Sequence, residues 1–137
     1  MTNCSTTIFE AQGKLEIADC TTYEYQLFDV ATIFLVLMFL TMEQRQNLIV
    51  QLLNKCRKGG AIIIVDKIEA KANYIGTINR RLTLAGKVAT GVSPEQIIAK
   101  ELSLAGIQRP LRDNELPKLA EQFFRFGEFA GWIIEKN

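Results

Sequence analysis

The chain has 137 residues, a length that predicts one domain, residues 1–137, with a core of its own. Its 16 basic residues balance 15 acidic ones, so the overall charge does not favour binding to nucleic acid or to a membrane surface. There is no histidine, which excludes Ser-His-Asp and Cys-His nucleophiles and histidine-ligated metal sites.

The cysteines and the hydropathy pattern indicate a cellular location. Cys4, Cys20 and Cys56 are too few and too scattered for a disulfide framework, and they show no paired zinc-ligand spacing. The sequence has no uninterrupted apolar run of about 18 residues, and its first residues do not form a secretion signal. We therefore expect a soluble, cytoplasmic protein without a bound metal.

The first predicted strand covers residues 14–20, in which Leu15 and Ile17 alternate with other residues and Asp19 stands near the end. A polar loop with Tyr23 and Tyr25 follows, at the place where ligands bind in open α/β sheets. The tyrosines are open to two interpretations. They stack on a base or substrate, or they cover the edge of the sheet.

A strand, a helix and a second strand form the centre of the predicted fold. Residues 28–37 are nearly all apolar, as in a parallel strand that is covered on both faces. Thr41 and Gln44 match a capping box that begins a helix, and we expect Gly59 to end it. Residues 61–66 form a second apolar strand, so a right-handed crossover should make the two strands parallel.

Two helices are predicted after this unit. One covers residues 73–87, and the other runs from a capping box at Ser93 and Gln96 to Ala105. Apolar residues recur at helical spacing in both, which predicts one inward-facing side on each helix. These inward-facing residues are Tyr74, Ile78, Leu82 and Ala85 in the first helix and Ile98, Leu102 and Ala105 in the second.

The end of the chain predicts an antiparallel hairpin. Alternating residues flank Gly127 and Glu128, a pair typical of a tight turn between two strands that close the sheet. The aromatic residues of this segment are expected in the core or in an interface rather than around a cofactor. They are Phe123, Phe124, Phe126, Phe129 and Trp132.

These segments, in this order, resemble the C-terminal two-thirds of class I S-adenosylmethionine-dependent methyltransferases. The resemblance is carried by the apolar run 32–40, the Gly-Gly pair before the strand at 61–65, Asp66 and Lys67 after it, and the ending 126–136. Within that superfamily the chain looks most similar to the carboxy-S-adenosylmethionine synthase and related tRNA-uridine-modifying group.

The resemblance implies a truncated Rossmann-like α/β fold, a three-layer sandwich around a mainly parallel sheet with a C-terminal antiparallel hairpin. In the superfamily, a Gly-rich loop after the first strand lets the backbone approach the methionine part of the cofactor, and an acid after the second strand holds the ribose. No G-x-G pattern occurs before Lys14. We therefore expect the cofactor-binding half to come from another chain.

The resemblance also implies S-adenosylmethionine as the cofactor and assigns residues to it. Asp19 and Cys20 match positions beside the adenine ring, although capping a turn is the other interpretation of Asp19. Phe34 stands where the synthase has a cofactor-binding asparagine. Gln96 stands where the synthase has an arginine that grips the extra carboxylate, so a carboxylated cofactor is not supported.

Four residues are candidates for binding substrate. Asp66 and Lys67 follow a buried strand and could orient or deprotonate an acceptor, or they could form an ion pair. Arg80 and Arg81 could bind a phosphate or carboxylate, or they could belong to a solvated face. No catalytic residue is assigned.

Two classes of function remain open. The chain is either a methyltransferase whose activity needs a partner chain to complete the cofactor site, or a non-catalytic binding or regulatory protein that retains the fold. Both leave the strand from Phe28 to Leu37 with an unpaired edge, which favours aggregation. We therefore expect a homo-oligomer or a partner chain at this edge.

Overall fold

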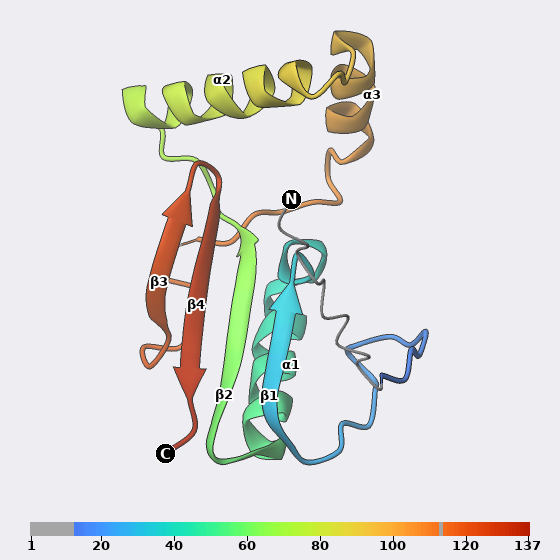
Figure 1. The fold of residues 1–137 in the computed structure, drawn as a ribbon, viewed down its shortest axis with the longest axis vertical. Coiled ribbons are helices and arrows are strands. Elements are labelled where there is room, and N and C mark those ends of the chain that lie inside the picture. The colour runs from blue at the N-terminus through green and yellow to red at the C-terminus, as the bar shows by residue number, and fades with distance from the viewer. Residues whose placement is uncertain (1–12, 113) are drawn as a thin grey trace, which may run out of the picture.

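A computed structural model describes residues 13–112 and 114–137, so Cys4 lies outside the described residues. The elements are β1 (Phe28–Phe34), a short 3-10 helix (Leu37–Phe39), α1 (Met42–Lys55), β2 (Cys56–Lys67), α2 (Tyr74–Ala89), α3 (Pro94–Ser103), β3 (Glu121–Phe126) and β4 (Phe129–Glu135). Within these residues the strands form one sheet in the order β1-β2-β4-β3. Helix α1 lies behind the sheet, and α2 and α3 lie beyond one end of it (Figure 1).

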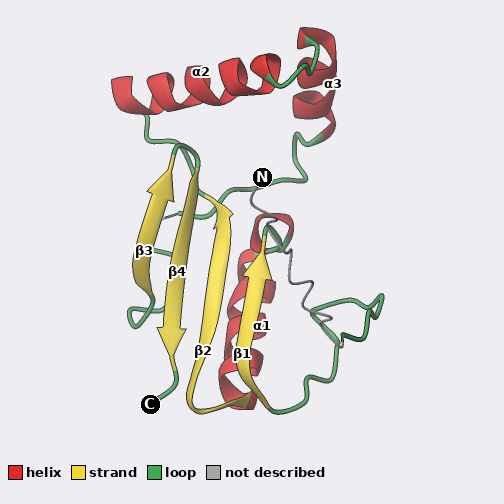
Figure 2. Ribbon diagram, viewed as in Figure 1, coloured by secondary structure: helices red, strands yellow, loops and turns green. Residues whose placement is uncertain are grey.

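The sheet is mixed rather than mainly parallel, which corrects the expected architecture. β1 and β2 are parallel, as predicted, and α1 connects them. β4 runs antiparallel to both β2 and β3 (Figure 2). The reason is that β1-α1-β2 supplies a single parallel pair in the described sheet, and the C-terminal hairpin supplies the other two strands.

Helix α1 begins where the sequence predicted. The Thr41 hydroxyl accepts a hydrogen bond from the Gln44 N–H, and the Gln44 side chain accepts one from the Thr41 N–H, which completes the capping box. The helix ends at Lys55 instead of at Gly59, because the chain is already extended at the next residue. Gly59 has the expected left-handed conformation (φ 76°), but it lies inside β2 and donates to the carbonyl oxygen of Lys136 at 2.7 Å.

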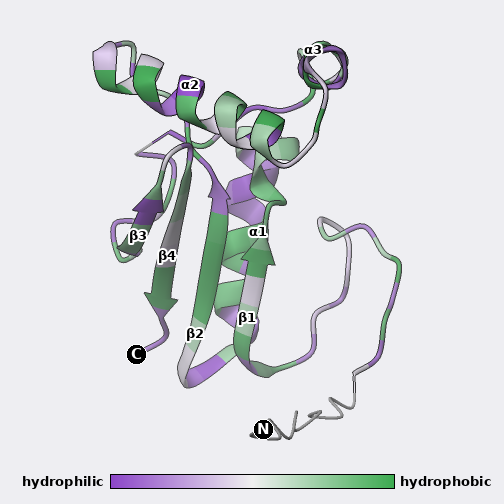
Figure 3. Cartoon of the chain, turned by 45° about the horizontal axis from the view of Figure 1, so that its top comes forward, coloured by the Kyte–Doolittle hydropathy of each residue, from purple (hydrophilic) through white to green (hydrophobic). Residues whose placement is uncertain are grey.

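The hydrophobic core lies between α1 and the sheet face that α1 covers. Ile62 and Ile64 of β2 and Ile134 of β4 are fully buried there, and Leu48 and Leu52 of α1 pack in the same cluster. Figure 3 shows that β2 is hydrophobic along most of its length. Full burial of one aliphatic side chain contributes about 1.5–3 kcal/mol, so this face is the main source of stability.

The opposite face of the sheet carries no helix from the described residues, so these residues do not form the expected three-layer sandwich (Figure 1). Along β1, Ile33 is buried toward α1, whereas Val30 and Phe34 point to the other face and are exposed. The difference has a simple cause. One crossover helix covers only one side of a sheet.

Helix α2 begins next to its predicted start, and α3 begins at its predicted capping box. The Asn73 side chain accepts from the Gly76 N–H at the start of α2. At the start of α3, Ser93 and Gln96 exchange the two hydrogen bonds of a capping box. Gln96 is thus a helix-capping residue in this chain.

The predicted inward faces of these two helices are wrong. Tyr74 and Leu82 of α2 and Ile98 and Leu102 of α3 are exposed, whereas Ile97 is buried. The helices project beyond the end of the sheet, so most of their apolar residues meet no core (Figure 1). Periodicity predicted the helices correctly but could not predict which element lies beside them.

Residues 14–20 do not form the predicted strand, and Leu15 and Ile17 are exposed. A strand requires a partner, and no strand in the described part of the chain pairs with this segment. β1 is consequently the edge of the described sheet.

A buried ion pair fixes the segment before β3 to α1. The Arg45 side chain is almost fully buried and pairs with the Glu115 carboxylate. Its other nitrogens donate to the carbonyl oxygens of Leu40, at 3.1 Å, and of Arg109. Arg109 itself pairs with Glu115 at 2.6 Å. Buried charges are costly unless they are paired, so this arrangement requires all of these groups in place.

Replacing one partner of this pair should be strongly destabilising. We expect Arg45→Met to lower the free energy of unfolding by about 3–5 kcal/mol, because the buried Glu115 carboxylate then keeps only Arg109 as a charged partner. The double variant Arg45→Met/Glu115→Leu should be more stable than Arg45→Met alone. Urea unfolding followed by circular dichroism measures both, and a loss below about 1 kcal/mol for Arg45→Met would contradict this account.

Candidate functional site

The carboxyl end of β1 turns sharply away from the sheet. Leu35 has φ 57°, a left-handed value that non-glycine residues rarely adopt, and its N–H donates to the Val65 carbonyl oxygen at 2.8 Å. The 3-10 helix follows, and its Leu37 N–H donates to Asp66 Oδ2 at 2.8 Å. Asp66 Oδ1 accepts from the Lys67 N–H at 2.7 Å. The Asp66 carboxylate therefore fastens this turn to the end of β2.

Asp66 is 0% exposed. Burial raises the pKa of its carboxyl group above the ordinary value, and the hydrogen bonds from backbone N–H groups oppose this shift. The structure thus places this predicted substrate residue inside the protein, where its oxygens are engaged by the backbone. It does not present Asp66 to a ligand.

Charged side chains gather where β2, α2 and the β3–β4 turn meet. Glu128 is buried, and its carboxylate lies 3.6 Å from Arg80 Nη1 and 3.9 Å from Lys67 Nζ. Lys67 Nζ also donates to Gln108 Oε1 at 3.3 Å. Two predicted substrate residues, Lys67 and Arg80, are therefore brought together by a residue that the sequence marked only as part of a turn. No local pattern signals this contact, because its members are far apart in the chain.

A second carboxylate extends this charged cluster to α3. Glu101 accepts from Arg80 Nη2 at 2.8 Å and from Lys87 Nζ at 3.1 Å. The hydrogen bond from Arg80 lowers the pKa of Glu101 to about 2; partial burial opposes it and Lys87 adds to it. Arg81 is exposed and has no ion pair or hydrogen-bonded side-chain partner among the described residues. Arg80 and Arg81 thus have different surroundings.

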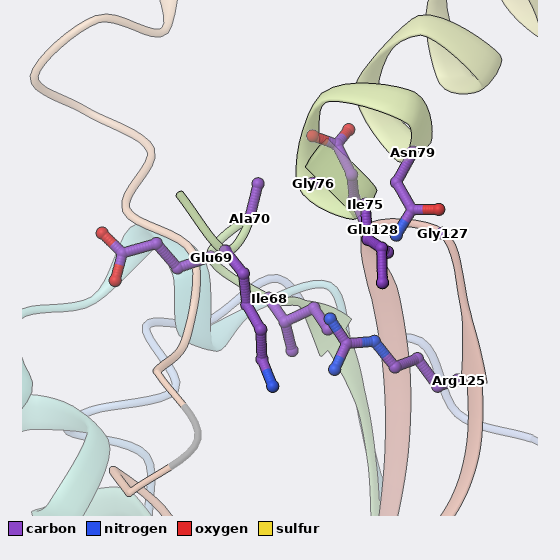
Figure 4. A pocket seen from close by; sticks show the side chains of 10 residues that line it. Ile68, Glu69, Ala70, Ile75, Gly76, Asn79, Arg125, Gly127 and Glu128 are labelled. Atoms are coloured by element: carbon purple, nitrogen blue, oxygen red, sulfur yellow. The ribbon is translucent and has the colours of Figure 1, made fainter. Parts of the chain in front are cut away.

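A small cavity lies between the start of α2 and the β3–β4 turn. Its lining includes Ile68, Asn79, Arg125 and Glu128, which Figure 4 shows converging from the residue after β2, from α2 and from the hairpin. Its volume is about 20 Å³, enough for one water molecule and far too small for a nucleoside cofactor.

A larger cleft opens beside it, between α2 and the same hairpin. Its volume is about 430 Å³, which lies in the usual range for small-molecule sites. Leu82, Phe126 and Phe129 give it mostly apolar walls, and Asn79 and Thr83 add polar groups. Sequence reasoning did not predict this cleft, because two distant segments form it.

Other classes of site find no support in the part of the chain that the structure describes. No group of three or more side chains there is arranged to hold a metal ion. Cys20 and Cys56 are free thiols, the first half-buried and the second buried. None of the described helices has the length and apolar character needed to cross a membrane.

Comparisons with known proteins connect this fold to a superfamily. No family model matches the sequence. Over 131 residues the chain is 24% identical to the carboxy-S-adenosyl-L-methionine synthase of Staphylococcus epidermidis (strain ATCC 35984 / DSM 28319 / BCRC 17069 / CCUG 31568 / BM 3577 / RP62A), a match that covers 90% of this chain and 58% of the synthase. The chain is related to the class I S-adenosylmethionine-dependent methyltransferase superfamily.

A solved methyltransferase structure shows the same fold. The S-adenosylmethionine-dependent methyltransferase SibL, in its apo form, matches with a TM-score of 0.52 and 9% sequence identity. The match covers 88% of this chain but 35% of SibL. The chain therefore spans only part of the length of both methyltransferase-superfamily proteins.

The residues that the superfamily resemblance assigns to S-adenosylmethionine lie in different parts of the fold. The exposed Asp19 carboxylate accepts from the Thr21 N–H at 2.8 Å and from the Thr21 hydroxyl at 2.7 Å, as in a capped turn. Both hydrogen bonds lower the pKa of the Asp19 carboxyl group, and the one from the Thr21 hydroxyl has the larger effect. This turn lies beside α1, and Cys20 packs partly buried against the core. Phe34 is exposed on the face away from α1, so it does not join Asp19 and Cys20.

Removing the Asp66 carboxylate should loosen the turn after β1. We expect Asp66→Ala to lower the free energy of unfolding by about 2–3 kcal/mol, because two buried N–H groups lose their acceptor. Asp66→Asn keeps one acceptor oxygen and should cost less. The exposed Asp29, substituted to alanine, is the control. Equal effects of Asp66→Ala and Asp29→Ala in urea unfolding would contradict the assigned role.

The ion pairs of Glu101 predict a specific pH dependence. Its lowered pKa means that the ionised form stabilises the folded state above pH 4.5, and this stabilisation is lost as the pH falls toward about 2. In Arg80→Gln the NMR titration midpoint of the Glu101 carboxyl carbon should move up toward 4.5. The neighbouring Arg81→Gln should leave the midpoint unchanged. A midpoint that ignores Arg80→Gln would rule out this ion pair in solution.

Proposed function

We propose that this chain is an S-adenosylmethionine-dependent methyltransferase-like domain whose cofactor site is completed by another polypeptide. The match to the carboxy-S-adenosyl-L-methionine synthase, which covers 90% of the chain, carries this proposal. The parallel β1–β2 pair supports it, because ligands in open α/β sheets bind outside the carboxyl ends of such strands. The scattered cysteines favour action in the cytoplasm.

The arrangement of the described residues supports a second polypeptide. Asp19 and Cys20 lie on a turn beside α1, and Phe34 lies on the other side of the sheet. The unpaired edge of β1, between Phe28 and Phe34, is where an added strand would extend the sheet and bring further cofactor-binding residues. A second copy of the chain or a different chain could supply it.

The chemistry of methyl transfer suits a protein without histidine. The cofactor carries the reactive methyl group, and the protein needs mainly to align an acceptor with it. Lys67, Arg80 and Arg81 stay the candidates for holding an anionic acceptor, and Arg81 is exposed and has no charged partner among the described residues.

One observation favours the alternative function, a non-catalytic binding or regulatory protein that retains the fold. The Asp66 carboxylate at the end of β2 is fully buried and accepts two backbone hydrogen bonds, so it is not available as a base. The two functions differ in whether the protein binds the cofactor.

Calorimetric titration with S-adenosylmethionine and S-adenosylhomocysteine tests the proposal. We expect saturable binding with a Kd in the micromolar range, about −8 kcal/mol, at protein concentrations where the chain self-associates. Asp19→Asn should weaken binding about tenfold, as expected for the loss of a charge-assisted hydrogen bond. The nearby exposed Glu24, changed to glutamine, is the control and should have no effect. Absence of binding at every concentration would leave the non-catalytic function.

A further inference from the structure

The sheet face away from α1 is apolar and exposed, and we call it the open face. Its half-buried centre consists of apolar residues on β2 and β4, and its exposed residues lie on the two outer strands. Several exposed apolar side chains gathered on one face differ from the scattered exposed apolar residues of ordinary monomers. The exposed residues are Val30 and Phe34 of β1 and Phe123, Phe124 and Phe126 of β3.

Two of these phenylalanines are held in place over Gly131 of β4. A Cβ atom at Gly131 would lie 2.3 Å from the Phe124 ring and 2.8 Å from the Phe123 ring. Gly131 stands between Ala130 and Trp132, which are buried toward α1, so its missing side chain points to the open face. The two rings also contact each other edge to face, with centroids 5.3 Å apart. This part of the open face is therefore preformed.

The exposed area is close to what a stable dimer needs. The four phenylalanines of the open face are between 36% and 80% exposed. At about 150–250 Å² per aromatic side chain, they offer roughly 500 Å² per copy. Val30 and the half-buried residues of the inner strands bring this toward the ~800 Å² per partner of a standard interface.

We propose that the open face binds a second copy of this chain. Two identical apolar faces complement each other about a twofold axis without any matching of charges. The formal net charge of +1 gives little repulsion between copies. Sheets packed face to face lie about 10 Å apart with their strands about 30° from parallel, which would place both α1 helices on the outside.

This surface is distinct from the edge of β1. A strand that pairs with the edge of β1 would bind its backbone groups. Packing on the open face instead uses side chains that point out of the sheet, such as Val30 and Phe126. The proposal therefore stands whether or not the chain binds S-adenosylmethionine, and its test needs no cofactor.

Sedimentation equilibrium and light scattering of the purified chain, with matched charge variants, test the proposal. We expect a dimer at roughly 100 µM chain, since interfaces of this size range from micromolar to tighter affinity. Val30→Glu and Phe126→Glu should each weaken the dimer by about 100-fold or more, because each buries an unpaired charge. Val30 is 60% exposed, so the substitution should cost the isolated fold little.

The controls carry the same change on other surfaces. Val50 of α1 is 55% exposed and Leu102 of α3 is 71% exposed, and Val50→Glu and Leu102→Glu should leave the dimer intact. If one open-face variant fails to fold by circular dichroism, the other decides, because Val30 and Phe126 lie on opposite edges of the sheet. A wild-type monomer at this concentration would overturn the proposal. So would a dimer that survives both open-face variants, or one that the control variants weaken equally.

Discussion

The packing of α1 against one face of the sheet is the constraint on which the rest of the structure depends. The parallel β1–β2 pair requires a crossover on one side, and α1 supplies it and buries Ile62 and Ile64. The same strands carry apolar side chains on both faces, as strands of α/β proteins do. Because no described helix covers the second face, it stays open, and apolar side chains of β1 and β3 are exposed on it.

Charge takes the place of apolar packing at the carboxyl end of the sheet. Helices α2 and α3 contact each other through Arg80, Lys87 and Glu101, while most of their apolar residues are exposed. Glu128 connects α2 to β2 through Arg80 and Lys67. Exposed ion pairs contribute little individually, but here Arg80, Glu101 and Glu128 each pair with two opposite charges and so form a network.

The relation to class I methyltransferases explains the fold better than it explains the activity. The match to the synthase covers 90% of the chain, and the fold is similar to that of the methyltransferase SibL. The residues that the resemblance assigns to the cofactor are divided between a turn beside α1 and the opposite sheet face. The fold is therefore the shared feature that the comparisons support, and the proposed cofactor site needs residues beyond these three.

The sequence by itself determined the features that rest on neighbouring residues. The capping boxes at Thr41 and Ser93, the parallel pair and the Gly127 turn were all predicted, because a few adjacent residues set caps, periodicity and turns. The tertiary structure alone decided that the Asp66 carboxylate is internal and that Glu128 joins Lys67 to Arg80. Burial and ion pairing depend on which distant segments of the chain meet, and the pattern of neighbouring residues in the sequence does not contain that information.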